Sequence, residues 1–272
     1  MTMAEVRTGM DRQMSLDDVK GLDELFARRA REAGLASRDF EVQRGVRYGE
    51  GLAEKLNIFP AGPMAPVIIF IHGGFWKSLD ADLFSFLAPG FVPFGGALVV
   101  IDYPLMPSSR MADIVVSCQR AVEWVHNNAD RFGGDANRIF VSGNSAGGHL
   151  VAEIMSRPGG HVIRGGTAIS GVFDLLPVTQ SFQNEDLNLT PEEVDNFSPL
   201  RRAATINAPM IVAVGADETE EFLRQSIEYA DQIGTQAMMI QNTNHITVVL
   251  DSLAKPMSML NQAVRSQMGL QL

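Results

Sequence analysis

Short apolar runs alternate with longer mixed segments along most of this chain of 272 residues. The runs lack the polar alternation of half-exposed strands, and they occur at 67–71, 97–101, 138–142, 166–170, 210–214 and 237–240. The segments between them are long enough for helices, most clearly at 111–129, where apolar residues recur at helical spacing. Strands of this kind that alternate with helices form parallel sheets covered on both faces. The pattern therefore predicts an α/β fold with a mostly parallel, twisted sheet and helices on both faces.

Three segments outside this alternation predict further elements. Residues 15–33 have apolar positions at helical spacing behind a candidate N-cap at Ser15, and they predict an amphipathic helix. Two partly alternating runs, 42–48 and 55–59, predict an antiparallel strand pair before the main sheet. The polar, proline-containing stretch 175–204 fits poorly as a sheet connection and predicts a small cap insertion. Because 46% of the residues are hydrophobic, the chain can bury a large core, and we expect a single domain over 1–272.

The formal net charge of −10 argues against binding partners that are themselves strongly negative. Nucleic acids and anionic membranes attract basic surfaces, and no cluster of lysine and arginine occurs, so we expect neither as a partner. No window has the length of a membrane span, and the first residues lack the apolar core of a signal peptide. The single cysteine, Cys118, cannot form an intrachain disulfide, which fits a cytoplasmic location. We expect a small-molecule substrate, and a homodimer is compatible with the sequence.

A G-x-S-x-G sequence follows the run 138–142 and is the first candidate for chemistry. In a nucleophile elbow, a serine sits on a strained strand-to-helix turn, and glycines two residues to either side leave room for that turn. Ser145, between Gly143 and Gly147, is therefore the candidate nucleophile, although an ordinary turn rich in glycine and serine matches the same positions. The cluster lacks the lysine of a phosphate loop, and no metal-ligand spacing stands out, so we expect no metal and no cofactor.

Residues 72–76, His-Gly-Gly-Phe-Trp, follow the run 67–71 as an exposed loop follows a strand. Consecutive glycines let the backbone approach a ligand closely and direct N–H groups at it, as an oxyanion hole requires. In hydrolases of this kind, one donor comes from such a loop and another from the residue after the serine. Gly73, Gly74 and Ala146 are therefore candidate oxyanion donors, although a Gly-Gly pair also occurs in plain turns.

A serine hydroxyl needs a positioned base, and the base needs a carboxylate that orients it. Among five histidines, His245 alone comes after the last apolar run, where the chain order serine, acid, histidine places the base. The acid is expected after the run 210–214, which leads into Asp217 and Glu218. Either carboxylate could instead cap the helix that begins near residue 219, and the residues alone leave both open.

These features together resemble the α/β-hydrolase fold, and in particular the kynurenine formamidases (arylformamidases). The shared motifs cover most of the chain and lie at 48–49, 72–76, 102–105, 131–135, 143–150 and 221–226. The more particular motifs are H-G-G followed by an aromatic residue and tryptophan, and E-F-x-R-Q-S after the acid. The resemblance implies a metal-independent serine hydrolase that cleaves an N-formyl aryl amine, N-formyl-L-kynurenine first, and it places the acid at Glu218.

The resemblance also implies candidate substrate contacts. Phe75 and Trp76 suit an aromatic wall, although aromatic residues after a buried strand are also ordinary core. Asn144 stands where a histidine is common before the serine, and Phe75 stands where a tyrosine is common. These departures concern contacts with the substrate and leave the Ser-His-acid pattern intact.

Two other functions are compatible with the same residues. A carboxylesterase, or a specialised amide or carbamate hydrolase acting on small aryl or short-acyl substrates, would use the same serine, histidine and acid. A binding protein could keep the fold without chemistry, because a fold alone does not imply a function. Such a protein usually has a damaged triad, whereas the pattern here is complete. An enzyme, a serine hydrolase, is therefore the leading hypothesis.

Overall fold

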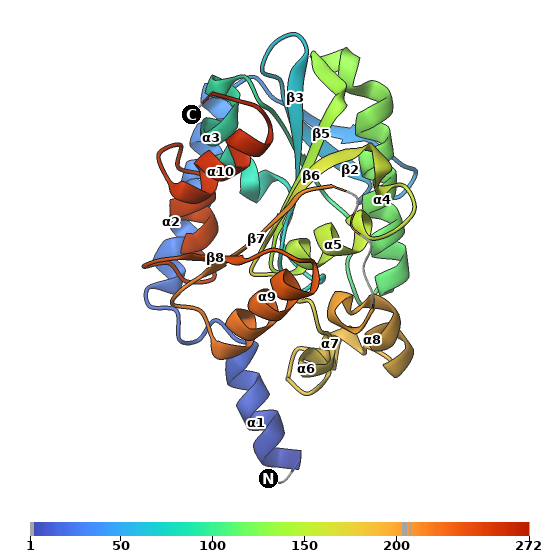
Figure 1. Ribbon diagram of the computed structural model, residues 1–272, viewed down its shortest axis with the longest axis vertical. Coiled ribbons are helices and arrows are strands. Elements are labelled where there is room, and N and C mark those ends of the chain that lie inside the picture. Colours follow the sequence, from blue (N-terminus) through green and yellow to red (C-terminus); the bar gives the residue numbers. More distant parts are fainter. Residues whose placement is uncertain (1–2, 203–205, 207, 272) are drawn as a thin grey trace.

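The structure is a computed structural model that describes residues 3–202, 206 and 208–271. Within these residues, eight strands form one sheet in the order β1-β2-β4-β3-β5-β6-β7-β8 (Figure 1). β2 pairs antiparallel with both β1 and β4, and all other neighbouring strands are parallel. The strands are β1 (Gln43–Arg47), β2 (Lys55–Phe59), β3 (Ala65–Ile71), β4 (Ala97–Ile101), β5 (Gly134–Asn144), β6 (Ile163–Ile169), β7 (Met210–Gly215) and β8 (Ala237–Ile240).

Helices cover both faces of this sheet (Figure 1). One apolar cluster packs α4, α5 and α9 against it, and a second cluster packs α2, α3, α10 and the 3₁₀ turn η1 (Asp82–Leu87) against the other face. The α-helices are α1 (Met3–Gln13), α2 (Leu22–Asp39), α3 (Ala88–Phe91), α4 (Met111–Asn128), α5 (Ala146–Met155), α6 (Leu176–Thr179), α7 (Asn184–Leu187), α8 (Pro191–Phe197), α9 (Glu220–Gln232) and α10 (Met259–Gln267).

The predicted α/β fold is confirmed, and each predicted strand is present. β3 and β4 are buried along their whole length, because helices lie on both faces of the sheet. Two-sided burial explains why these runs show no polar alternation. The antiparallel pair expected at 42–48 and 55–59 is β1 with β2. Parallel pairing brings the carboxyl ends of β3, β5, β6, β7 and β8 to one edge of the sheet, where the loops after them meet.

The N-terminal helix differs from the prediction. α2 covers Leu22–Asp39 rather than 15–33, and Gly21, at a φ of 65°, precedes it. Ser15 is therefore not the N-cap of this helix; its hydroxyl instead accepts a hydrogen bond from the N–H of Asp17 (3.0 Å), a local turn that competes with helix formation. Leu16 and Val19, whose spacing is that of one face of a helix, lie in the irregular segment 15–21.

The predicted cap insertion at 175–204 falls on α6, α7 and α8, which follow β6 and lie together below the sheet in Figure 1. Its residues 203 and 204 lie outside the described residues. That this segment acts as a cap, and that the chain is a single domain, stay predictions. No helix in the described ranges is both long and apolar enough to cross a membrane.

Candidate active site

The turn between β5 and α5 carries Ser145. This residue has a φ of 59° and a ψ of −122°, a backbone conformation that residues other than glycine rarely adopt. Its N–H donates to the carbonyl of Ile169 on the neighbouring strand (2.8 Å). The turn packs closely on β3, since a Cβ on Gly147 would lie 1.9 Å from the carbonyl oxygen of Ile71. The sharp strand-to-helix turn expected from the G-x-S-x-G sequence is present.

The loop after β3 crosses directly over this turn. A Cβ on Gly73 would lie 2.9 Å from the carbonyl oxygen of Asn144 and 3.0 Å from Cβ of Ser145. Among the described residues, the N–H groups of Gly73 and Gly74 find no hydrogen-bond acceptor. Ala146 is the first residue of α5, where N–H groups lack an acceptor within the helix. All three candidate oxyanion donors thus lie close to Ser145 or directly follow it.

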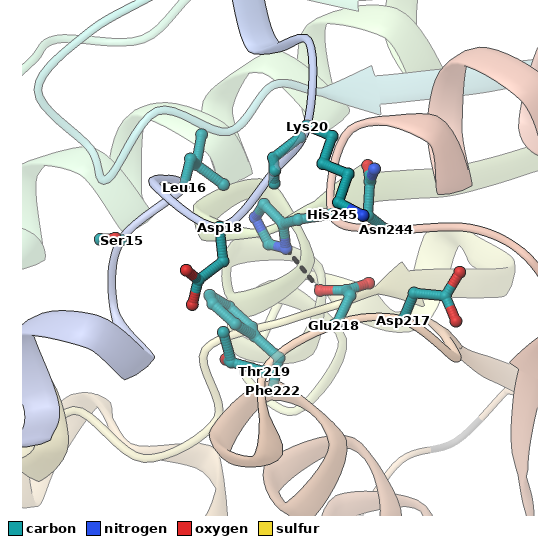
Figure 2. A pocket seen from close by; sticks show the side chains of 11 residues that line it. Ser15, Leu16, Asp18, Lys20, Asp217, Glu218, Thr219, Phe222, Asn244 and His245 are labelled. Atoms are coloured by element: carbon teal, nitrogen blue, oxygen red, sulfur yellow. Dashed lines mark hydrogen bonds and ion pairs between the residues drawn. The ribbon is translucent and has the colours of Figure 1, made fainter.

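His245 and Glu218 form a buried pair at the same edge of the sheet. The Nδ1 atom of His245 lies 2.6 Å from Oε2 of Glu218, whose side chain is fully buried (Figure 2). The other carboxylate oxygen, Oε1, accepts hydrogen bonds from the Ser170 hydroxyl (2.5 Å) and the Gly215 N–H (2.8 Å). A carboxylate only accepts, so a neutral His245 carries its proton on Nδ1 and leaves the Nε2 lone pair free.

Asp217, the other carboxylate that the sequence left open, points away from His245 (Figure 2). Its N–H donates to the carbonyl of Thr243 (2.9 Å). Its carboxylate makes no hydrogen bond or ion pair within the described part of the chain. Neither carboxylate caps α9, which begins after Thr219. Of the two, Glu218 is the one in contact with His245.

Ser145 and His245 line one cavity of about 420 Å³. Loops at the sheet edge form its inner side, through Gly73, Gly74, Phe75 and Asn144. Side chains from distant parts of the chain form its outer side, namely Leu16, Phe26, Arg29 and Phe182. The Ser145 hydroxyl makes no hydrogen bond with any described residue, so it is free to rotate toward His245 or toward a bound ligand.

The sequence analysis did not identify two residues that the structure places at this site: Ser170, which contacts Glu218, and Arg29, which lines the cavity. Ser170 directly follows β6 and has a φ of 49°. Its position at the carboxyl end of a parallel strand is the signal that could have found it. Arg29 carries no such signal, because it belongs to α2 and reaches the cavity only through the packing of α2 on η1.

Trp76 and two histidines, His149 and His72, are buried and do not line the cavity. Trp76 is fully buried in the core, and its indole N–H donates to Nδ1 of His149 (3.2 Å). The opposite nitrogen, Nε2, donates to the carbonyl of Phe197 (2.8 Å). Burial lowers the pKa of His149 to about 3, and it lowers the pKa of His72, which stacks on Tyr103, to about 4. Both rings are neutral at pH 7, and the placement of Trp76 does not favour contact with a substrate.

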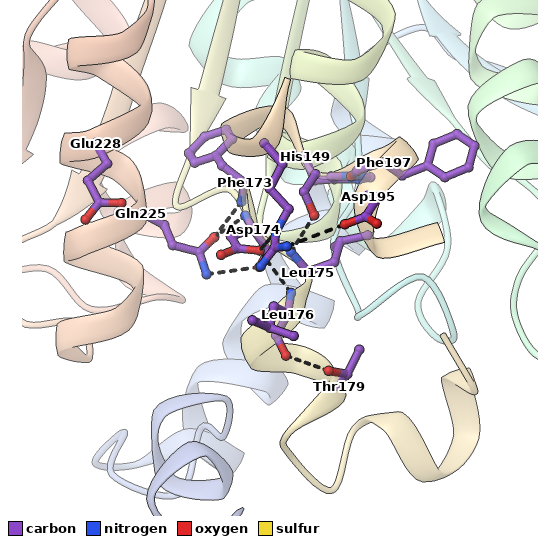
Figure 3. Close-up of polar contacts among 12 residues, drawn as sticks. His149, Phe173, Asp174, Leu175, Leu176, Thr179, Asp195, Phe197, Gln225 and Glu228 are labelled. Atoms are coloured by element: carbon purple, nitrogen blue, oxygen red, sulfur yellow. Dashed lines mark hydrogen bonds and ion pairs between the residues drawn. The ribbon is translucent and has the colours of Figure 1, made fainter. Parts of the chain in front are cut away.

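Polar contacts fasten the segment after β6 to the body of the protein (Figure 3). Oε1 of Gln225, on α9, accepts hydrogen bonds from the N–H groups of Phe173 (2.6 Å) and Asp174 (2.8 Å). The N–H of Leu175 donates to the Ser198 hydroxyl (2.9 Å). The glutamine of the E-F-x-R-Q-S motif therefore anchors the two residues that precede the predicted cap insertion.

Comparison with known proteins agrees with this architecture. A family model named BD-FAE matches residues 60–157. The kynurenine formamidase of Salmo salar is 29% identical over 258 residues, which cover 87% of this chain and 85% of that protein. A structure from Silicibacter sp. TM1040, for which thioesterase activity has been suggested, is 27% identical with a TM-score of 0.85 and covers 93% of this chain and 97% of its own. An esterase of Pyrobaculum calidifontis is 18% identical, with a TM-score of 0.72 and 97% of each chain covered.

This chain is a hydrolase of the α/β-hydrolase type. The resemblance to kynurenine formamidases expected from its motifs is confirmed by the match over most of its length. The hydrolase carries the loop 72–76 and the turn 143–147 inside the segment that matches the BD-FAE model. Its His245 and Glu218 lie beyond that segment and are brought to it by the sheet.

Proposed function

We propose that this hydrolase is a serine hydrolase that removes the formyl group from an N-formylated aryl amine, with N-formyl-L-kynurenine as the first candidate. The observation that carries the proposal is the shared cavity of Ser145 and His245, in which His245 is oriented by the buried Glu218. In the first step, the Ser145 oxygen attacks the formyl carbon while Nε2 of His245 takes the hydroxyl proton. His245 then gives that proton to the leaving amine, and a formyl ester on Ser145 remains.

Water completes the cycle. His245 takes a proton from a water molecule, the resulting hydroxide attacks the formyl ester, and Ser145 leaves with the proton returned by His245. The products are formate and the free aryl amine. Glu218 holds the imidazole of His245 so that its Nδ1–H points at the carboxylate. It also stabilises the imidazolium that forms during acylation and again during deacylation.

Negative charge on the carbonyl oxygen of each tetrahedral intermediate needs donors that are already in place. We assign this role to the N–H groups of Gly73, Gly74 and Ala146. The unpaired N–H groups of Gly73 and Gly74 support the assignment, because they line the cavity beside Ser145. Phe75 and Asn144 also line the cavity, and we propose that they contact the substrate.

The formyl substrate is supported by the similarity to a kynurenine formamidase over 87% of this chain. An alternative acyl substrate is a short-acyl or aryl ester, whose cleavage needs the same attack on an acyl carbonyl as the thioesterase activity suggested for the structure at 27% identity. The same three residues would serve both reactions, so the choice between them rests on substrate preference. Cys118 is buried and forms no disulfide, which supports a proposed cytoplasmic location.

The test is steady-state kcat/KM for N-formyl-L-kynurenine beside p-nitrophenyl acetate. Ser145→Ala is expected to lower both values by about 10⁴-fold or more, because the nucleophile acts as a unit with its base. Ser266→Ala, an exposed serine on α10, is the matched control and should change neither value. A formamide value well above the ester value supports the formamidase, whereas ester turnover without formamide turnover contradicts that substrate. Retained activity in Ser145→Ala contradicts the mechanism.

A further inference from the structure

Arg29 lies in the wall of the cavity that Ser145 and His245 share. It belongs to α2, which packs with the second apolar cluster on one face of the sheet. Its α2 helix packs on η1, and this contact directs Arg29 toward the cavity. Only 8% of the residue surface is exposed. A largely buried arginine therefore lines the same cavity as the proposed nucleophile and base.

The guanidinium of Arg29 has no partner of opposite charge in contact with it. Its Nε atom is buried without a hydrogen bond, and no ion pair or hydrogen bond reaches the group from any described residue. Its neighbours are the rings of Phe26 and Phe84, at 4.9 and 5.3 Å from the guanidinium carbon. Burial lowers the pKa of Arg29, with Asp80 opposing the shift from beyond contact distance.

Other basic side chains in comparable positions are satisfied. Lys77, which lines the same cavity, pairs with Asp186 (2.6 Å). Arg265, which is more deeply buried than Arg29, donates to Oδ1 of Asn261 and to the backbone carbonyl oxygens of Pro256 and Gln271. An unpaired buried cation is costly, so Arg29 stands out as a group prepared for a partner from outside the chain.

We propose that Arg29 binds a carboxylate of the substrate, at a point of the cavity away from the acyl group that reacts. The proposal rests on the proposed function, because it takes the cavity as the substrate site. The planar guanidinium presents paired N–H donors that match a carboxylate, and burial strengthens such charge-assisted hydrogen bonds. The net charge of −10 repels anions at long range, so a local cation is needed to hold one. Arg29 thus selects aryl amides or esters that carry an acid group, such as an amino-acid side chain on the ring.

A pair of substrates that differ in one carboxylate tests this role. N-formyl-L-kynurenine carries the carboxylate, and N-formylkynuramine keeps the formamide, the ketone and the amine without it. In Arg29→Met, kcat/KM for the acid is expected to fall about 10- to 100-fold, mainly through KM, because a hydrogen-bonded ion pair is lost. The value for the compound without carboxylate should stay within about twofold. Arg31→Met, an exposed arginine on the same helix, should change neither value.

A purely structural role gives a different result. Loss of packing would lower the melting temperature and reduce both values of kcat/KM together, and this outcome would overturn the proposal. We expect Arg29→Met to keep or raise the melting temperature, because the buried cation has no protein counter-charge. Arg29→Lys, which keeps the charge without the planar fork, should recover part of the preference for the acid.

The test also separates Arg29 from the formyl assignment. If formamides are not turned over, 3-acetoxybenzoate and phenyl acetate provide the same comparison through an acetyl ester. Loss of the preference for the acid in Arg29→Met would then support the carboxylate site while the formyl substrate is rejected. A wild-type enzyme that does not prefer the acid in either pair would reject the carboxylate site and leave the formamidase proposal standing.

Discussion

The inner and outer sides of the cavity are built differently. On the inner side, loops at the edge of the sheet bring together Ser145, His245 and Glu218, and Glu218 accepts hydrogen bonds from three groups. On the outer side, Leu16 and Phe182 are apolar walls, and Arg29 has no polar partner in the described chain. The buried acid of the inner side is therefore fully hydrogen-bonded within the protein, whereas the buried cation of the outer side is not.

This difference assigns the chemistry to one side and the choice of substrate to the other. A catalytic group must be held in one geometry by its own neighbours, because small displacements cost rate. A binding group can remain unsatisfied until the ligand arrives. Changes to Glu218 and the residues that hold it should therefore affect kcat for every substrate, and changes to the outer side should affect KM for particular ones.

The largest expected effect comes from the two neighbouring carboxylates. Glu218→Gln should lower kcat/KM by about 10³- to 10⁴-fold, because the amide no longer fixes the tautomer of His245 or stabilises its charged form. Asp217→Asn is the matched control, since its side chain points away from His245, and it should cost less than about threefold. Kinetics on p-nitrophenyl acetate measure both, and a larger loss in Asp217→Asn would show that the acid has been misassigned.

Acid should destabilise the folded protein through two buried histidines, His149 and His72. The pKa of His149 is about 3 in the folded protein against 6.5 for the free side chain. The unfolded chain therefore binds this proton first, and the free energy of unfolding falls as the pH drops below about 6.5. His72 adds the same effect down to about pH 4.

His149→Gln removes one of these protons. Between pH 6 and 4.5, the slope of the unfolding free energy against pH should decrease by about 1.4 kcal/mol per pH unit in this variant. Urea unfolding at several pH values measures the slope. An unchanged slope would mean that His149 is protonated as easily in the folded protein as in the unfolded chain.

Ser170 should have a smaller effect on the inner side. Ser170→Ala removes one of the hydrogen bonds to Glu218, and we expect kcat to fall about tenfold with little change in KM. Ser156→Ala, a serine at the end of α5, is the control. If kcat of Ser170→Ala equals that of the wild type, Gly215 alone is sufficient to hold the carboxylate.

The smallest effect is expected on the outer side. Phe182→Ala shortens an apolar wall that is 39% exposed, so KM for an aryl substrate should rise about two- to fivefold with kcat unchanged. Leu52→Ala, an exposed apolar residue outside this cavity, is the control. A loss in kcat rather than in KM would contradict the division between the two sides.

Local patterns in the sequence were enough to predict the sheet, the turn at Ser145 and the loop at Gly73. Each depends on residues that are close in the chain: apolar runs buried on both faces, and glycines where the backbone passes within contact distance of β3. The order of His245 after the last strand followed from the same alternation. Such features can be predicted from the sequence because burial and backbone sterics act over a few residues.

Tertiary structure decided the rest. The choice between Asp217 and Glu218 depends on the direction of two adjacent side chains, which the motif resemblance favoured but the residues alone left open. The outer side was not predictable, because residues 15–21 adopt an irregular path set by local hydrogen bonds and by packing over the cavity. Arg29 meets the cavity only after α2 docks on η1. The sequence determined which groups the protein has for its chemistry, and the packing of distant segments determined which substrate features those groups can meet.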